Sequence, residues 1–321
     1  MQWKLKAKIQ NAISILPSAA SYEAYYWVQR RFGGLRQVVP TKKIIAAIET
    51  WKRIQNQECS PIGKVFLEVG TGRVPLVPIG YWLMGAERTI TIDLNPYLKE
   101  ELIAECLSYI SKNENEILTL FGSLIDRRRL NALVRFGTKS KLSVTEFLDL
   151  CQITYIAPGD AANTSLPEQH IDFHTSYTVF EHIPPNVLVD ILREGNRIIK
   201  NNGLFIHRID YSDHFSHSDK SISAINFLQY SNNEWAKYAD NRYMYMNRLR
   251  HDDFLALFES VGQQIVAVEP DIDQRSEDLL KTNGLSLNDS FSSKKEEILA
   301  ISRAWILTKK TAKFSPKNLP E

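Results

Sequence analysis

Val65-Phe-Leu-Glu-Val-Gly-Thr-Gly-Arg73 is a short apolar run that ends in two glycines. Residues 65 to 69 are β-branched, aromatic or aliphatic apart from Glu68, a composition typical of a buried parallel strand. Gly70 and Gly72 lack a Cβ, so the backbone can turn sharply and approach a ligand closely. Open α/β sheets bind nucleotides at turns of this kind, where a strand ends. The stretch therefore predicts the first strand and the first ligand loop of an α/β domain.

Beyond the glycine turn, the alternating residues 88 to 92 predict a second strand that ends at Asp93. An acidic residue about 20 positions after such glycines is placed to accept hydrogen bonds from ribose hydroxyls. The alternative is a loop aspartate before Asn95-Pro96, which is a turn signal. The interval and the strand end favour the ribose role.

The remaining pattern alternates between strands and helices, as in an α/β protein. Predicted strands follow at residues 152–156, 169–177, 204–209, 264–268 and 299–307. Predicted helices cover residues 22–32, 75–84, 97–111 and 250–262, and Ser21 is the expected N-cap of the first of these. A further helix begins at Thr41, and another begins at Pro185 and ends at Asn201-Asn-Gly203. Residues 112–150 predict inserted helices whose Arg127-Arg-Arg129 is solvated surface, and residues 269–298 predict a loop.

The glycine turn resembles the first motif of class I S-adenosylmethionine (SAM) methyltransferases, Glu-x-Gly-x-Gly-x-Gly. Glu68, Gly70 and Gly72 match this motif, whereas Val74 stands at the third glycine position. The resemblance implies a Rossmann-like, seven-stranded, mostly parallel sheet with helices on both faces. It also implies that the seventh strand runs antiparallel between the fifth and the sixth.

Three later segments are similar to those of the methyltransferase group often called type 11. They are Gly159-Asp-Ala161, Ile171-Asp-Phe173 and Phe180-Glu-His-Ile183, in the expected order and at similar intervals. By this resemblance Asp160 receives the adenine amino group, and SAM is the expected cofactor. The implied cofactor-binding residues are Glu68, Gly70, Thr71, Gly72, Asp93, Leu94, Asp160, Ala161, Ser176 and Tyr177.

A general base would help transfer to a hydroxyl, and histidine titrates near neutral pH. The candidates near the expected strand exits are His182, His207, Asp210 and His214, of which we favour His182, His214 and Asp210 as catalytic. Helix capping and core packing are the structural alternatives. The group Asp210, Asp213, His214 and His217 offers an alternative divalent metal set, but we expect no metal.

Length and composition fit a globular protein of 321 residues, with 44% hydrophobic and 24% charged residues. The three cysteines lie far apart, which argues against a disulfide framework and favours the cytoplasm. The sequence has no apolar run of membrane-spanning length and no signal-peptide core. A net charge of +2 gives little electrostatic attraction to nucleic acid, and we therefore do not expect nucleic acid as a partner.

We expect an N-terminal helical cap over residues 1–57, a SAM-binding domain over 58–308 with insertions at about 112–150, 211–247 and 269–298, and a flexible tail over 309–321. The cap carries ten basic and two acidic residues. Its first helix, residues 1–17, is amphipathic; packing against its own protein is expected, and peripheral contact with anionic lipid is the alternative. The aromatic insertion 211–247 predicts an acceptor-side lid, or else a subdomain that fills its own core.

The sequence therefore predicts a SAM-dependent methyltransferase that acts on a small-molecule acceptor, by O-methylation of a saccharide or secondary metabolite. One alternative is a non-catalytic, methyltransferase-like scaffold at a membrane surface. Another is an NAD-type dehydrogenase, but Pro75 replaces the last glycine of that fingerprint. The sequence gives no indication of the oligomeric state.

Overall fold

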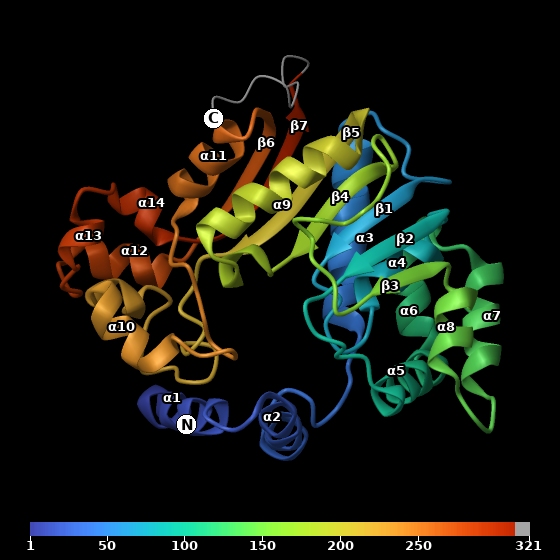
Figure 1. Ribbon diagram of the computed structural model, residues 1–321, viewed down its shortest axis with the longest axis horizontal. Coiled ribbons are helices and arrows are strands. Elements are labelled where there is room, and N and C mark those ends of the chain that lie inside the picture. The colour runs from blue at the N-terminus through green and yellow to red at the C-terminus, as the bar shows by residue number, and fades with distance from the viewer. Residues whose placement is uncertain (312–321) are drawn as a thin grey trace. The chain divides into compact units, whose positions relative to one another are not determined.

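The structure, a computed structural model, describes residues 1–311, and so most of the predicted tail lies outside the described residues. Seven strands form a sheet in the order β3-β2-β1-β4-β5-β7-β6 (Figure 1). The strands are β1 Val65–Val69, β2 Arg88–Ile92, β3 Ile153–Ile156, β4 Ile171–Tyr177, β5 Ile199–Asp210, β6 Gln263–Ile272 and β7 Ile301–Lys310. Every predicted strand is present.

Most of this sheet is parallel, but β7 runs the other way. Strand β1 pairs in parallel with both β2 and β4, and β2 pairs in parallel with β3. Just past the end of β5, the Tyr211 amide donates to the Ser302 carbonyl near the start of β7, at 2.8 Å. At the other end, the Lys310 ammonium donates to the Ile199 carbonyl at 2.7 Å. Strand β7 is therefore antiparallel to β5, and it lies between β5 and β6 as expected.

The helices connect these strands. They are α1 Trp3–Ser14, α2 Ser18–Phe32, α3 Thr41–Asn56, α4 Leu76–Leu83, α5 Glu100–Lys112, α6 Glu114–Phe121, α7 Arg127–Gly137, α8 Val144–Leu150, α9 Pro185–Ile198, α10 Asn232–Ala239, α11 His251–Ser260, α12 Gln274–Lys281, α13 Asp289–Ser292 and α14 Glu296–Ala300. Short 3₁₀ helices are η1 Gly122–Leu124, η2 Phe180–His182 and η3 Asn226–Gln229. None of the helices within residues 1–311 is both long and apolar enough to cross a membrane.

Four boundary predictions were wrong. Ser21 lies inside α2, where its hydroxyl donates to the Ile13 carbonyl at 2.8 Å instead of capping the helix. Strand β5 already begins at Ile199, so Asn201-Asn-Gly203 is part of a strand and not of a helix end. Residues 269–298 contain three helices and the end of β6. Strand β7 continues to Lys310, into the predicted tail.

Contacts divide the chain into two compact units. The glycine-turn unit comprises residues 37–177, 190–207 and, among the described residues, 307–311. The histidine unit comprises residues 1–36, 178–189 and 208–306.

Helices α3 and α4 cover one face of β1 in the glycine-turn unit. The ring of Phe66 on β1 stacks on Tyr81 of α4 at 4.3 Å and on Trp51 of α3 at 5.9 Å between centroids. The two helices approach so closely that a Cβ built on Gly80 would lie 2.4 Å from the Cβ of Ala47. Glycine at this position therefore permits the helix pair that supports the glycine turn from behind.

The inserted helices of the glycine-turn unit carry a partly buried cation. Arg129 of α7 donates to the carbonyls of Trp82 and Ala86, each at 2.7 Å. Arg127 and Arg128 are exposed. The prediction of solvated surface for all three arginines was therefore wrong for Arg129, whose guanidinium satisfies carbonyls at the end of α4.

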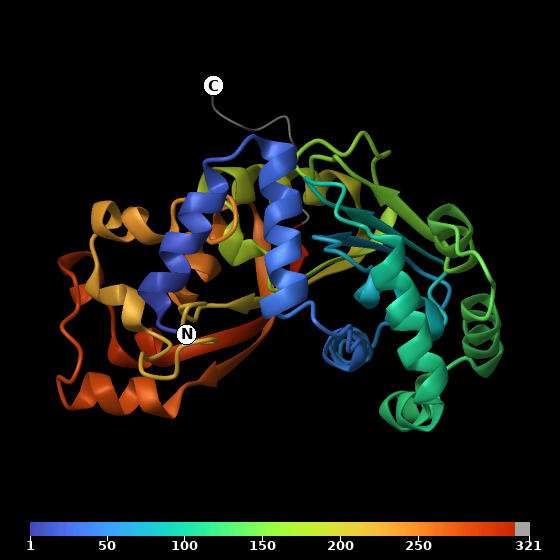
Figure 2. The same ribbon diagram turned by 90° about the horizontal axis from the view of Figure 1, so that it is seen from below.

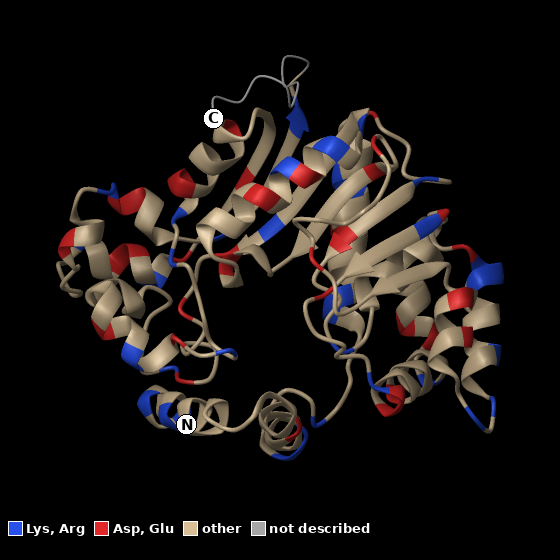
Figure 3. Ribbon diagram, in the orientation of Figure 1, with Lys and Arg blue, Asp and Glu red and all other residues tan. Residues whose placement is uncertain are grey.

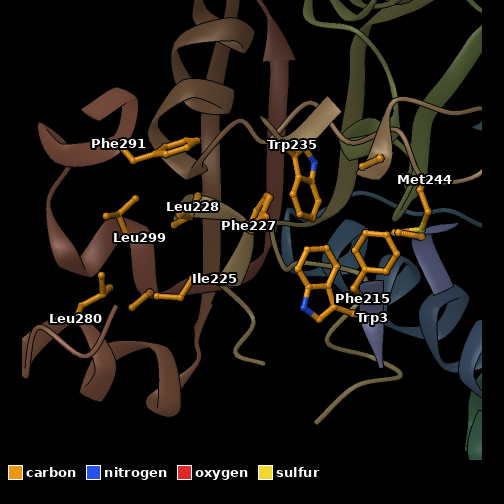
Figure 4. Close-up of a cluster of buried hydrophobic side chains, with 13 residues drawn as sticks. Trp3, Phe215, Ile225, Phe227, Leu228, Trp235, Met244, Leu280, Phe291 and Leu299 are labelled. Carbon is orange, nitrogen blue, oxygen red and sulfur yellow. The ribbon is translucent and has the colours of Figure 1, made fainter. Parts of the chain in front are cut away.

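Aromatic side chains of the insertion 211–247 form the core of the histidine unit (Figure 4). Trp3 of α1 packs on Tyr238 with ring centroids 4.9 Å apart and on Phe215 at 5.4 Å. Trp235 and Phe227 are buried beside them, 5.7 Å apart. Their burial supports the alternative of a subdomain that fills its own core, and α1 completes that core.

Candidate functional site

Four strands of the glycine-turn unit end level with one another. In the parallel register, Val69 of β1 lies opposite Ile92 of β2 and Ser176 of β4. Ile92 in turn lies opposite Ile156 of β3. Because the carboxyl ends of parallel strands meet at the same edge, the loops that follow these residues leave the sheet side by side. We call this region the glycine-turn edge.

The first loop of this edge needs glycine for conformational reasons. Gly70 and Gly72 have φ angles of 89° and 70°, in the left-handed region that other residues rarely adopt. The Gly70 amide donates to the Ile92 carbonyl at 2.8 Å, which fixes the start of the turn. A Cβ added at Gly72 would meet no atom within 4 Å. The turn therefore presents bare backbone to open space, as a loop that accommodates a ligand requires.

Asp93 joins the second loop to the first. Its Oδ2 accepts a hydrogen bond from the Gly72 amide at 2.9 Å, and its Oδ1 accepts one from the Asn95 amide at 3.1 Å. Partial burial raises the pKa of the Asp93 carboxyl, while the Gly72 amide lowers it. Each carboxylate oxygen can accept a second hydrogen bond. The carboxylate therefore positions the glycine turn and keeps acceptor capacity for a hydroxyl-bearing ligand.

The third loop is tied to the second through backbone atoms. The Gly159 amide donates to the Asp93 carbonyl at 2.9 Å. A Cβ at Gly159 would lie 2.8 Å from the Ile156 carbonyl oxygen, so the close approach excludes other residues. The side chain of Asp160 is exposed, with Oδ1 accepting from the Ala162 amide at 2.8 Å, and Ala161 is buried. The structure thus brings Asp93 and Asp160 to neighbouring loops of one edge.

Two other predicted cofactor residues support the turn from inside. Glu68 is only 2% exposed and accepts a hydrogen bond from the Thr175 hydroxyl of β4. Burial raises the pKa of the Glu68 carboxyl to about 7. The hydroxyl of Thr71 is hydrogen-bonded to that of Thr91 at 2.6 Å. The side chains of Glu68 and Thr71 therefore hold strand ends together.

The last predicted residues flank the edge. Ser176 is buried, and its Oγ is hydrogen-bonded to the Nδ1 of His207 at 2.8 Å. The ring of Tyr177 lies 4.5 Å from the Lys43 ammonium. Leu94, beside Asp93, is 73% exposed. Burial holds the pKa of His207 well below its usual value, and this histidine lies in the core of the glycine-turn unit.

Sequence reasoning missed Lys43, which lies on α3 next to these residues. Its ammonium donates to the Tyr177 carbonyl at 3.4 Å and lowers the pKa of Glu68 by its charge. Arg73 is a second cation at this edge: its guanidinium lies 5.0 Å from the Tyr97 ring and lowers the pKa of Asp93. Lys43 precedes the glycine turn by a whole helix, so no local motif marks it.

The three predicted catalytic residues lie in the histidine unit. His182 of η2 hydrogen-bonds through Nδ1 to the Tyr245 carbonyl at 2.8 Å, and its ring centroid lies 4.8 Å from that of His214. The Nε2 of His214 is 3.8 Å from the Oδ2 of Asp210 at the end of β5. This separation is too long for a hydrogen bond. The residues are therefore neighbours without forming a bonded catalytic dyad.

The order and direction of the strands identify the fold. A seven-stranded sheet in the order β3-β2-β1-β4-β5-β7-β6, with β7 antiparallel, is the fold expected of class I SAM-dependent methyltransferases. The chain has this fold, and the loops after β1, β2 and β3 meet where such a sheet binds its nucleotide-like ligand.

Comparisons with known proteins give likenesses in structure only. No protein-family model and no curated protein matches the sequence. A chain of the solved complex that contains the Trm112 methyltransferase activator of Haloferax volcanii is 13% identical with a TM-score of 0.47, and the match covers 90% of this chain and 96% of that chain. A SAM-dependent methyltransferase from Mesorhizobium loti is 11% identical with a TM-score of 0.42, with 83% and 100% covered. A SAM-dependent methyltransferase from Methanosarcina mazei is 12% identical with a TM-score of 0.43, with 80% and 96% covered. The fold assignment rests on the strand order of the chain itself.

Proposed function

We propose that this protein is a SAM-dependent methyltransferase that transfers a methyl group to a hydroxyl of a small-molecule acceptor, a saccharide or a secondary metabolite. The observation that carries the proposal is the link between Gly72 and Asp93. The glycine turn exposes backbone without side chains at Gly72. The Asp93 carboxylate, which accepts from the Gly72 amide, keeps lone pairs that can accept from hydroxyl groups of a ligand. An adenosyl group combines a flat base with a ribose diol, whose hydroxyl groups would donate to the Asp93 carboxylate.

The roles of the residues follow from their positions. Asp93 would accept hydrogen bonds from the ribose hydroxyls, and Asp160 would accept one from the adenine amino group. Lys43 and Arg73 supply positive charge near the edge for an anionic group of the ligand. Bound SAM supplies a sulfonium methyl group that a positioned nucleophile can take. The contribution of the protein is then binding, orientation and exclusion of water.

The acceptor would lose its proton as the methyl group forms its new bond to oxygen, and S-adenosylhomocysteine would be the second product. His182, His214 and Asp210 remain our predicted bases for that proton. The Nδ1 of His182 must donate to the Tyr245 carbonyl, which leaves Nε2 with a free lone pair when the ring is neutral. His182 is thus in the tautomer that a base acting through Nε2 requires.

A dehydrogenase fits less well. Dinucleotide-binding Rossmann sheets have the strand order 3-2-1-4-5-6, whereas here an antiparallel strand separates β5 from β6. The buried Glu68 and the exposed Asp160 also have no role in a pyrophosphate site. NAD should therefore leave the melting temperature unchanged.

Calorimetric titration of S-adenosylhomocysteine into the full chain tests the proposal. We expect Gly72→Arg to lower the affinity at least about 100-fold, because the side chain fills the open space beside the turn. Gly63→Arg is a matched control, since Gly63 has a similar φ of 68° and also has no atom within 4 Å of its Cβ position. Equal affinities in the two variants would contradict the site assignment.

Asp93→Ala tests the same site through charge and hydrogen bonding. We expect it to lower affinity for S-adenosylhomocysteine at least about tenfold through the lost carboxylate. Asp149→Ala, on the exposed surface of α8, should bind like the unmodified protein. Retained affinity in Asp93→Ala, or failure of the unmodified protein to bind SAM and S-adenosylhomocysteine, would overturn the proposal.

A further inference from the structure

The segment that follows β5 brings potential metal ligands together within the histidine unit. Asp210 ends the strand, and His214 and His217 follow in a turn-rich loop. One potential ligand atom from each of these three residues lies within 4.8 Å of the others. A second group, of Glu181, His182 and His214, meets the same limit and shares His214. His214 is therefore the centre of a cluster drawn from two separate segments.

Distances within this cluster suit ligands of one ion better than hydrogen-bonded partners. The Oδ2 of Asp210 lies 3.8 Å from the Nε2 of His214 and 3.8 Å from the Nε2 of His217. Two ligands that each lie about 2.0–2.1 Å from one metal are separated by roughly 3.0–3.4 Å at tetrahedral or cis octahedral angles. The observed separations exceed this by a few tenths of an ångström, which small rotations of the side chains can close.

His214 supplies an independent indication. Its Nε2 is buried and, within the described residues, makes no hydrogen bond. A buried polar atom without a partner is costly unless something binds it.

The surrounding hydrogen bonds hold these ligands in place. His182 donates through Nδ1 to the Tyr245 carbonyl at 2.8 Å, which directs a lone pair to Nε2. His182 is thereby held as a neighbour of His214. The Ser212 hydroxyl donates to the Oδ1 of Asp210 at 2.5 Å, which leaves Oδ2 for the ion. The same hydroxyl is hydrogen-bonded to the Nε2 of His217 at 3.0 Å, and an ion at this nitrogen would replace that bond.

Asp213, which the sequence suggested as a further ligand, instead accepts hydrogen bonds from the loop itself. Its Oδ1 accepts from the Phe215 amide at 2.9 Å and its Oδ2 accepts from the Asn226 amide group at 2.8 Å. These bonds fix the loop that carries His214 and His217. Lys6, whose charge acts on His214, donates to the Ser218 hydroxyl at 3.1 Å and is balanced by the carboxylate of Asp213.

We propose that Asp210, His214 and His217 bind one divalent transition metal ion. Imidazole nitrogens with a carboxylate oxygen favour Zn²⁺ and its first-row neighbours over Mg²⁺ or Ca²⁺. Binding of the ion can be measured without SAM or an acceptor, so this proposal can be tested separately from the proposed methyl transfer. Two of its ligands, Asp210 and His214, are also predicted bases, so a bound ion would replace their role in proton transfer and leave His182 as the predicted base.

Titration of Zn²⁺ into the full chain, after treatment with a chelator, tests this proposal. We expect one ion per chain, a rise in melting temperature, and an at least 100-fold weaker affinity in His214→Ala. His217→Ala alters a half-exposed side chain and keeps the loop bonds of Asp213, so it should fold normally and still bind at least tenfold more weakly. His170→Ala, in the glycine-turn unit, is the matched control and should bind as the unmodified protein does.

Substitution with Co²⁺ gives a second measurement that does not depend on activity. We expect visible d–d absorption with the intensity of a four-coordinate site, absent in His214→Ala and retained in His170→Ala. No stoichiometric Zn²⁺ binding by the unmodified protein, or equal binding by the His214→Ala, His217→Ala and His170→Ala variants, would overturn the proposal.

A second inference concerns helix α1, whose apolar stripe faces outward. Leu16, which is 42% exposed, lies just beyond the end of α1. Within the helix, Leu5 and Ile9 are 52% and 37% exposed, and Ala12 on the same face is also exposed. Their spacing of three and four residues places them on one side of the helix. The opposite side carries Trp3, which packs into the aromatic core. The first helix therefore packs on its own protein, as expected, but through the side that carries Trp3 and not through the side that carries Leu5 and Ile9.

Basic residues and further apolar groups accompany this stripe. Lys4 and Lys8 are exposed on α1, and Figure 3 shows basic residues in blue along this helix. Helix α2, which contacts α1 and is seen with it in Figure 2, exposes Trp27 by 60% and Phe32 by 72% beside the exposed Arg31. Exposed apolar side chains flanked by lysine and arginine fit the interface of an anionic bilayer.

We propose that α1 and the end of α2 bind peripherally to an anionic lipid surface. Co-sedimentation of the full chain with phosphatidylcholine vesicles, with and without 30% phosphatidylglycerol, tests this. We expect binding to the anionic vesicles that falls at least tenfold in Ile9→Asp. Ile62→Asp, at a residue 64% exposed in the glycine-turn unit, should bind normally. Equal binding of both variants, or a dimer in the absence of lipid that Ile9→Asp dissociates, would overturn the proposal.

Discussion

The glycine-turn edge and the histidine cluster are assembled in different ways. The edge is built largely from backbone atoms at the ends of neighbouring strands, with Asp93 bonded to the Gly72 amide. The cluster is built from side chains of η2 and of the loop after β5, with His214 shared between two groups. Strand register brings the first set together, whereas the second depends on how two distant segments pack. The two regions therefore differ in what their residue types alone can reveal.

The largest expected effect concerns the core of the histidine unit. Trp3 is buried among Phe215, Trp235 and Tyr238. Trp3→Ala should lower the free energy of unfolding by about 4 kcal/mol, the usual cost of removing a buried aromatic side chain. Urea unfolding followed by circular dichroism measures this. The affinity for S-adenosylhomocysteine of the folded variant should stay unchanged, because Trp3 belongs to the histidine unit.

The matched control is Trp27→Ala, because Trp27 lies on α2 and is 60% exposed. Its loss should change the free energy of unfolding by no more than about 1 kcal/mol, as for other surface substitutions. Equal losses in the two variants would contradict the view that α1 completes the aromatic core.

A smaller effect is expected at the glycine-turn edge. In Gly159→Ala the new Cβ would lie 2.8 Å from the Ile156 carbonyl, so the loop must shift. We expect a loss of about 2 kcal/mol in the free energy of unfolding, typical of overpacking. The Gly159 amide also holds the Asp93 carbonyl, so S-adenosylhomocysteine should bind about tenfold more weakly.

Gly34→Ala provides the comparison for this prediction, because a Cβ there would meet no atom within 4 Å. It should change neither stability nor affinity by a measurable amount. If Gly159→Ala binds S-adenosylhomocysteine normally, the third loop is not part of the cofactor site.

The two regions also show what can be predicted from sequence. Gly70, Gly72 and Asp93 follow apolar runs of strand length, so their pattern predicts both the strands and the ligand loops. Lys43 carries no local signal, because only the packing of α3 against β1 brings it to the edge. Contacts between distant elements decide such positions, and periodicity within an element does not report them.

The same limit explains the wrong predictions. Asn201-Asn-Gly203 looks like a helix end, but pairing in the sheet extends β5 through it. The stripe of Leu5 and Ile9 has the period of a buried helix face, yet the wider face with Trp3 packs into the core. Periodicity shows that the two sides of a helix differ in hydrophobicity. Which side meets the protein depends on the shape of the partner surface.

The smallest expected effect is a pH dependence that originates at Glu68. Its pKa is about 7 in the folded chain and near 4.5 in the unfolded chain, because burial disfavours the charged form. Between these pH values the folded state holds a proton that the unfolded state has released. The stabilisation by the protonated carboxyl is therefore fully present below pH 4.5 and is lost as the pH rises to about 7.

Glu68→Gln removes this titration while keeping an oxygen that can accept from the Thr175 hydroxyl. Relative to the unmodified protein, the variant should gain about 1–2 kcal/mol in the free energy of unfolding between pH 6 and pH 8. Urea unfolding at each pH measures the difference. Glu146→Gln, at an exposed residue of α8, is the control and should show no such gain. A constant difference between Glu68→Gln and the unmodified protein would mean that Glu68 is already ionised at pH 6, held by Lys43, and that the glycine-turn edge contains a buried ion pair.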